Sequence, residues 1–128
     1  MIKSLNLLKK FESGDSELIA LNNLSFEIPQ GQFVAITGRS GSGKSTLLYQ
    51  LGLLDQPTGG QVYVDGVDAT ALSNEDRTTM RLTELGYIFQ DYALIPELTA
   101  SENVMIPLLM KGMSLAEAEI QANLSLER

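Results

Sequence analysis

The chain has 128 residues, of which 44% are hydrophobic and 20% are charged, and this composition is ordinary for one small globular domain. Sixteen acidic and nine basic residues give a net charge of −7 at pH 7, so a broad basic surface for nucleic acid is not expected. The absence of cysteine excludes disulfides and thiolate metal sites and fits a reducing compartment, with the cytoplasm as the expected location.

The first third of the chain is predicted to be rich in β-structure. Leu5 to Phe11 is expected to form a short strand, and Glu12 to Glu17 a polar turn. Leu21 to Ile28 alternates apolar and polar residues, which predicts a second strand with one apolar face. After a proline-glycine turn, the apolar run from Phe33 to Ile36 predicts a buried strand.

The segment from Gly38 to Thr46 fits the pattern G-x-x-x-x-G-K-[ST], which binds the phosphates of a nucleotide. Its glycines let the backbone bend tightly, so that N–H groups converge on phosphate oxygens. Lys44 is expected to reach the β and γ phosphates, and the Ser45 hydroxyl to ligate Mg²⁺. A helix is expected to follow as far as Leu51, and its positive N-terminal end favours the anion. The residues predicted to hold the triphosphate are Gly38, Ser40, Gly41, Ser42, Gly43, Lys44, Ser45 and Thr46.

The remainder is predicted to contain short strands and polar helices. Gln61 to Asp65 is expected to be a strand. A polar helix that begins at the capping box Ser73 to Asp76 is expected to end near Leu85. Gly86 to Phe89 is expected to form a short buried strand that ends at Gln90. The last two helices are expected to separate near Gly112. Three capping boxes mark the starts of these helices, at Ser73 to Asp76, Thr99 to Glu102 and Ser114 to Glu117.

Charged residues on the first of these helices are interpreted as structural. The segment Asn74-Glu75-Asp76 falls in its first turn, where the two acids complement the helix dipole, so a solvated helix start is favoured over a metal site. Arg77 and Arg81 lie one turn apart on one face and are expected to be exposed.

The phosphate loop and the residues after it resemble the nucleotide-binding subunit of ATP-binding cassette (ABC) transporters. The loop has the form typical of that family, and Gln90, at the end of Leu85 to Phe89, resembles the family's Q-loop glutamine. The stretch from Asp91 to Val104 is similar to the family's sequence after that glutamine, where L-T-x-x-E-N-V recurs. The resemblance covers nearly the whole chain and is closest to the lipoprotein-releasing and macrolide-exporter branch.

This resemblance implies an α/β fold, a P-loop NTPase of ABC type. A β-rich N-terminal subdomain is expected to precede the phosphate-loop strand and helix. The core sheet is expected to be incomplete, and helices are expected at the C-terminal end. In the family the parallel neighbours of the phosphate-loop strand come from later residues, so part of the surface of this strand would lack cover.

Three site residues or segments take roles from the resemblance, each with a plainer alternative. Phe11 falls where the family places an aromatic that stacks on adenine; the alternative is a strand residue packed in the core. Gln90 would ligate Mg²⁺ or orient the attacking water; the alternative is a polar residue that ends a strand. Asp91 to Leu98 resembles the surface that docks a cytoplasmic helix of the membrane partner; the alternative for its apolar residues is packing under a loop.

The resemblance implies an ATP-binding subunit that binds ATP and Mg²⁺ and, in the complete protein, hydrolyses ATP to drive a transmembrane permease. Export or lipoprotein release is the expected direction of transport. A second ATP-binding subunit is the expected dimer partner, and the protein would be peripheral on the inner face of the cell membrane, held there by the permease.

Several motifs of an ABC ATPase are not found in this sequence. It contains no histidine, no Ser-Gly-Gly-Gln after Gln90, and no apolar run that ends in Asp-Glu. Residues 1–128 are therefore expected to be the N-terminal part of one ATP-binding domain, cut before these motifs, and hydrolysis by this chain alone is not expected. The alternatives are a non-catalytic nucleotide-binding remnant and a different P-loop ATPase or kinase.

Overall fold

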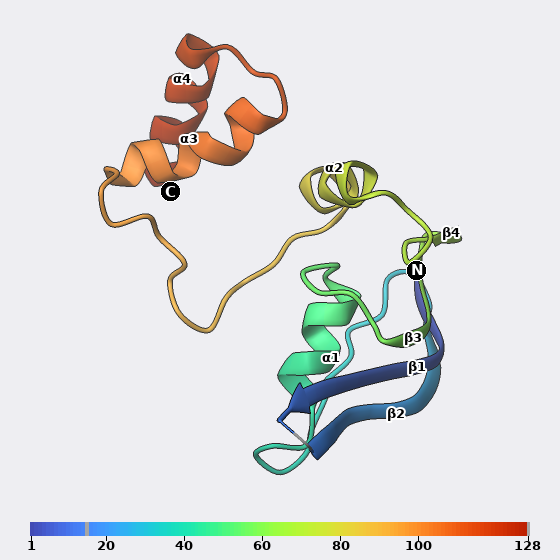
Figure 1. The fold of residues 1–128 in the computed structure, drawn as a ribbon. Helices are drawn as coiled ribbons and strands as arrows, with labels where there is room; N and C mark the ends of the chain where they lie inside the picture. The colour runs from blue at the N-terminus through green and yellow to red at the C-terminus, as the bar shows by residue number, and fades with distance from the viewer. Residues whose placement is uncertain (15, 128) are drawn as a thin grey trace. The chain divides into compact units, whose positions relative to one another are not determined.

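The computed structural model describes residues 1–14 and 16–127 of the chain. They form two compact units, one ending at Thr78 and one beginning at Thr79. The mixed α/β class predicted from the sequence is confirmed. In chain order the elements are β1 (Ile2–Ser13), β2 (Ser16–Ile28), α1 (Lys44–Leu51), β3 (Gly59–Val64), β4 (Val67–Asp68), α2 (Asn74–Glu84), α3 (Ala100–Met110) and α4 (Leu115–Leu126) (Figure 1).

The first unit is built on a four-stranded sheet. Its strand order is β2-β1-β3-β4, and all three neighbouring pairs are antiparallel. β1 and β2 form a hairpin that pairs Ile2 with Ile28 at one end and Phe11 with Leu18 near the other. Both strands are longer than the sequence predicted, because polar residues assigned to the turn continue the ladder. The β-rich start of the chain is therefore confirmed.

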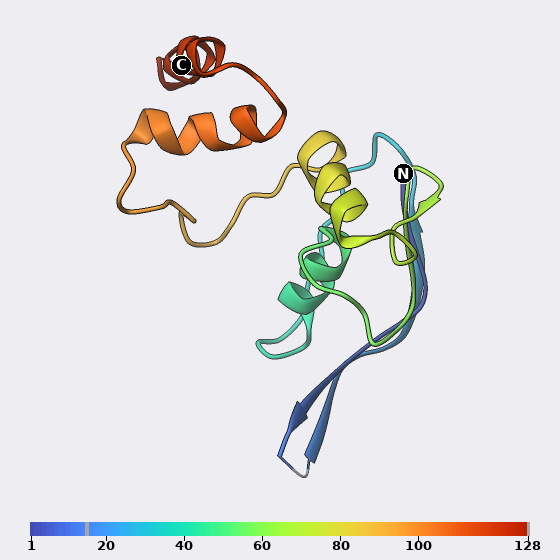
Figure 2. The same cartoon turned by 45° about the horizontal axis from the view of Figure 1, so that its top comes forward.

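Helix α1 lies beside this sheet in both views (Figures 1 and 2). The side of α1 that carries Leu47 and Leu51 is buried, as are Leu7 of β1 and Val62 of β3. Full burial of an aliphatic side chain of this size contributes about 1.5–3 kcal/mol each. These side chains hold the helix that follows the phosphate loop against the sheet.

Arg77 of α2 is buried, and the expectation that it is exposed is wrong. Its guanidinium Nη2 donates hydrogen bonds to the carbonyl oxygens of Leu53 at 3.2 Å and Asp55 at 3.1 Å. Only 6% of the residue is accessible to solvent. The segment between α1 and β3 covers the side of α2 that carries Arg77. The spacing of the two arginines along the helix could not predict this contact.

Two apolar stretches predicted to be buried strands are not strands in the structure. Residues 33–36 and 86–89 have no regular secondary structure, and Phe33 and Ile88 are each 98% exposed. A strand requires a neighbour to pair with its N–H and C=O groups, and none of the described strands pairs with either stretch. The sheet of this chain is thus antiparallel throughout the described residues, and the core sheet is incomplete, as expected.

The second unit contains the helical pair α3 and α4. Both predicted capping boxes are present: the side chain of Thr99 accepts from the Glu102 N–H, and that of Ser114 from the Glu117 N–H. Met105 packs with Ala118 and Ala122 of α4 to form the buried cluster of this unit. No helix among the described residues is long and apolar enough to cross a membrane.

Candidate functional site

A cavity of about 290 Å³ lies between the β1–β2 hairpin and the phosphate loop. It belongs entirely to the first unit, and its walls come from three short segments of chain. The lining residues are Phe11 of β1, Leu18, Ile19 and Ala20 of β2, and Ser40, Gly41, Gly43, Lys44, Ser45 and Thr46 of the loop and the start of α1. One wall is thus apolar and aromatic, and the other consists of polar backbone and side chains.

The polar wall is the start of helix α1. Gly43 precedes the helix with φ of +85°, a left-handed conformation that glycine adopts without steric cost. The first-turn N–H groups of a helix have no intrahelical acceptor, and Gly43 has no side chain to cap them. α3 and α4, by contrast, begin with capping side chains. The uncapped start of α1 therefore presents backbone donors and the positive end of its dipole to an anion.

Lys44 supplies the cation of this wall. Its Nζ donates to the carbonyl oxygen of Gly38 at 3.0 Å and to that of Arg39 at 2.7 Å. The ammonium thus lies within the curve of its own loop, and the turn is closed by the Ser42 N–H, which donates to the Arg39 carbonyl at 3.2 Å. A phosphate oxygen that reached the loop would offer this ammonium an anionic acceptor in place of the two neutral carbonyls, so that both donor and acceptor of the bond would be ionised.

The phosphate loop and the hairpin are in direct contact. A Cβ placed on Gly43 would lie 2.5 Å from the carbonyl oxygen of Ala20 in β2. Only glycine allows the two backbones to come this close. The contact fixes the start of α1 against the strand that forms the opposite wall of the cavity.

Phe11 lies on the apolar wall of the same cavity as the loop. It is 42% exposed, so the alternative of a residue packed in the core does not describe it. The structure therefore brings Phe11 together with most of the predicted phosphate-binding residues. Gly38 and Ser42 belong to the same loop but do not line the cavity.

Gln90 belongs to the second unit, in an exposed irregular segment directly after Phe89. Its role as a Mg²⁺ ligand stays a prediction. In the segment that follows, Leu94 is 62% exposed and Ile95 is 44% exposed. The amide of Asn103 donates to the carbonyls of Ile95, Leu98 and Thr99 at 3.0–3.2 Å and accepts from the Ile95 N–H at 2.8 Å. The end of this segment is therefore fixed on α3.

Sequence reasoning missed three residues of the apolar wall, Leu18, Ile19 and Ala20. The signal lay in the hairpin register. A strand that ends near Phe11 and returns through a tight polar turn must place an apolar residue of the second strand opposite the ring, and here that residue is Leu18.

Comparison with known proteins gives a consistent result. The ABC transporter family matches residues 21–128. The chain is 42% identical to the ABC transporter ATP-binding protein MJ0796 of Methanocaldococcus jannaschii, over 99% of this chain and 54% of that protein. It is 44% identical to the lipoprotein-releasing system ATP-binding protein LolD of Xylella fastidiosa, over 99% of this chain and 53% of that protein. It is 43% identical to the macrolide export ATP-binding/permease protein MacB of Brucella abortus, over 95% of this chain and 19% of that protein.

The fold agrees with these relatives. A dimeric structure of MJ0796 bound to ADP and Pi superimposes with a TM-score of 0.91 at 42% identity, covering 99% of this chain and 56% of that one. The chain thus spans about half the length of MJ0796 and LolD. A family match over most of the chain, together with identity above 40% to several relatives, identifies the chain as a member of the ABC transporter ATP-binding family.

Proposed function

We propose that this chain is the nucleotide-binding part of an ABC transporter ATPase and that it binds ATP with Mg²⁺ in the cavity between hairpin and phosphate loop. The observation that carries the proposal is the convergence of an aromatic ring, Phe11, and the uncapped, lysine-bearing start of α1 on one cavity. A nucleoside triphosphate has the matching chemistry, since its base is flat and apolar on its faces and its phosphates are anionic. The structural relative bound to ADP and Pi supports the same ligand class.

Each group of the cavity has a definite task in this proposal. The N–H groups of the first turn of α1 and the Lys44 ammonium bind the β and γ phosphates. The Ser45 hydroxyl, which lines the cavity, is the expected ligand of Mg²⁺, and the ion when bound neutralises part of the phosphate charge. The Phe11 ring offers a face on which adenine stacks. Gln90 is proposed to approach the metal or the attacking water through its amide oxygen.

The activity of the whole protein extends the proposal beyond this chain. LolD belongs to a lipoprotein-releasing system, MacB joins ATP-binding and permease functions, and MJ0796 was solved as a dimer. By analogy we propose that the complete protein pairs with a second ATP-binding subunit and hydrolyses ATP. It would drive a transmembrane permease in export or lipoprotein release, and would be located on the inner face of the cell membrane through that permease.

The test is the affinity for ATP of the Lys44→Ala variant, measured by isothermal titration calorimetry with Mg²⁺ present. Loss of the ammonium removes a charge-assisted contact to the phosphates, and we expect the Kd to rise at least tenfold, about 1.4 kcal/mol. Lys111→Ala is the matched control, because Lys111 is an exposed lysine of the second unit at the end of α3. An unchanged Kd in Lys44→Ala would contradict the site assignment.

A further inference from the structure

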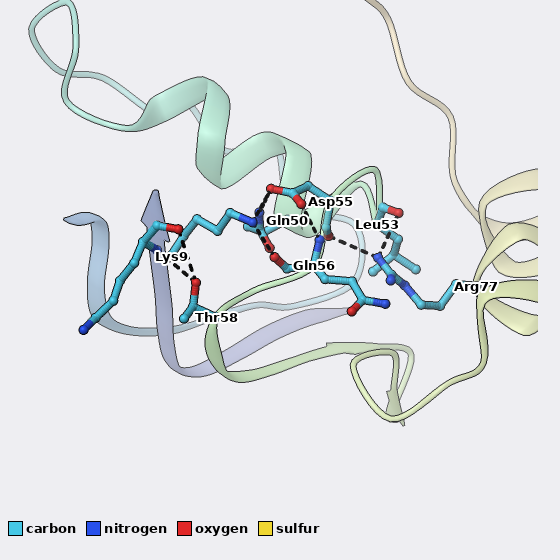
Figure 3. Close-up of polar contacts among 8 residues, drawn as sticks. Lys9, Gln50, Leu53, Asp55, Gln56, Thr58 and Arg77 are labelled. Atoms are coloured by element: carbon cyan, nitrogen blue, oxygen red, sulfur yellow. Dashed lines mark hydrogen bonds and ion pairs between the residues drawn. The ribbon is translucent and has the colours of Figure 1, made fainter. Parts of the chain in front are cut away.

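Lys9 of β1 occupies a position in the first unit that the proposed nucleotide chemistry does not use. It lies two residues before Phe11, and its side chain is only 13% exposed. Its ammonium is 2.7 Å from the Oδ2 of Asp55 and donates to the carbonyl oxygen of Gln56 at 2.7 Å (Figure 3). Both acceptors lie just beyond helix α1, which ends at Leu51. The lysine therefore connects the second half of β1 with the segment that follows the phosphate-loop helix.

The same ammonium also contacts the aromatic ring of the cavity. Lys9 Nζ lies 5.2 Å from the ring centroid of Phe11, within the range of a cation–π interaction. Phe11 lines the cavity and Lys9 does not. The cation thus holds the ring from outside the space in which a ligand would bind.

Asp55 is held in place for this contact by further hydrogen bonds. The Gln50 amide, which is 1% exposed, donates to Oδ2 at 2.9 Å, and the Gln56 N–H donates to Oδ1 at 2.7 Å. Burial raises the pKa of Asp55, but the hydrogen bonds from Lys9, Gln56 and Gln50 outweigh it and lower the pKa below its ordinary value. The carboxylate is therefore ionised at neutral pH. The buried Arg77 also binds Asp55, because its guanidinium donates to the backbone carbonyl oxygen of Asp55.

Hairpin and phosphate-loop helix are consequently joined near both ends of the helix. At its start, the backbone of Gly43 lies against Ala20 of β2. Past its end, Lys9 pairs with Asp55. The hairpin and the helix segment are thus joined at two separate places. The second contact includes the cation that lies over the Phe11 ring.

We propose that Lys9 is a positioning residue for the base-binding end of the site: by joining the Phe11 ring to the end of α1, it sets the ring at the distance that lets one nucleotide reach both ring and phosphate loop. The inference rests on the proposed function. It assigns to Lys9 that part of the affinity which depends on the base. The phosphate-dependent part stays with Lys44 and the loop.

The experiment compares two ligands that share phosphates but differ in the base. Binding of ATP and of inorganic tripolyphosphate, each with Mg²⁺, is measured by calorimetry on the full chain. In Lys9→Ala we expect the Kd for ATP to rise about fivefold, the value of a cation–π contact of about 1 kcal/mol, while the Kd for tripolyphosphate stays within about twofold. Lys9→Arg, which keeps the cation, should retain most of the affinity for ATP.

Lys10→Ala is the matched control. Lys10 is the next residue on the same strand, and its ammonium pairs with Glu17 at 2.6 Å rather than with Asp55. We expect no change for either ligand. Asp55→Asn is a second probe, which keeps Lys9 and removes only the charge of its partner. It should also weaken the binding of ATP but not that of tripolyphosphate. If Lys9→Ala does not fold, the Asp55→Asn variant tests the proposal in its place.

Two results would overturn the proposal: unchanged ATP affinity in both Lys9→Ala and Asp55→Asn, or equal losses for ATP and tripolyphosphate, which would indicate general damage to the unit. Failure of the proposed function has a different signature. In that case the unmodified chain binds neither ligand, or Lys44→Ala binds both as well as the unmodified chain does, and both proposals are then overturned.

Discussion

The contact between Gly43 and β2 makes a quantitative prediction about stability. In Gly43→Ala, the new side chain suffers two separate costs. A left-handed conformation at φ of +85° costs an L-residue about 1–2 kcal/mol. In addition, the Cβ would lie 2.5 Å from the Ala20 carbonyl oxygen, which is backbone in the sheet and cannot rotate away. Overpacking of this kind typically costs about 1–3 kcal/mol. We expect a total loss of about 2–5 kcal/mol in the free energy of unfolding, measured by urea denaturation followed by circular dichroism.

Gly66→Ala separates the two costs. Gly66 has the same φ of +85°, but a Cβ there would meet nothing within 4 Å. It therefore carries the conformational cost alone, and both variants share the same entropic effect on the unfolded chain. We expect Gly43→Ala to be less stable than Gly66→Ala by at least about 1 kcal/mol. Equal stability of the two variants would refute the argument that the loop is pressed against β2.

Two further substitutions test other parts of the structure. Arg77→Met removes charge-assisted hydrogen bonds to one buried and one half-buried carbonyl, and we expect about 2 kcal/mol less stability by urea denaturation; an unchanged midpoint would contradict the role of Arg77. The side-chain and backbone hydrogen bonds from Ser114 lower the pKa of Glu117. The stabilisation from these bonds is therefore fully present at a pH above 4.5, the ordinary pKa of the group, and is lost as the pH falls through the lowered pKa. Ser114→Ala should return this pKa toward 4.5 in an NMR titration; an unmoved pKa would argue against the capping box.

The parts of the fold that the sequence predicted well are those determined by neighbouring residues. A capping box is complete within four residues, and α2, α3 and α4 each begin directly after the predicted cap. The phosphate loop is similar, since its glycines, its lysine and the helix start lie in one short segment. In both cases the residues that define the feature lie next to one another in the chain, so the sequence pattern is sufficient.

The errors occurred where the environment comes from distant residues. The stretch 33–36 is apolar, which favours burial, but a strand forms only beside another strand, none of the described strands pairs with it, and Phe33 is exposed. The expectation that Arg77 is exposed was wrong for the opposite reason. Its charge indicated exposure, but Leu53 and Asp55 supply carbonyl acceptors for the guanidinium, and these residues lie outside the helix on which the expectation was based.

The two ends of the proposed nucleotide site differ in the same way. The phosphate end follows from one continuous motif. The base end requires the register of β1 on β2, which places Leu18 opposite Phe11, and the return of the chain that brings Asp55 beside Lys9. From sequence alone Phe11 could equally have been a core residue, because nothing near it in the chain specifies a cavity. The proposed recognition of the base is therefore the property that the motif encodes least. The aromatic ring and the cation beside it take their positions only when sheet and helix have packed together.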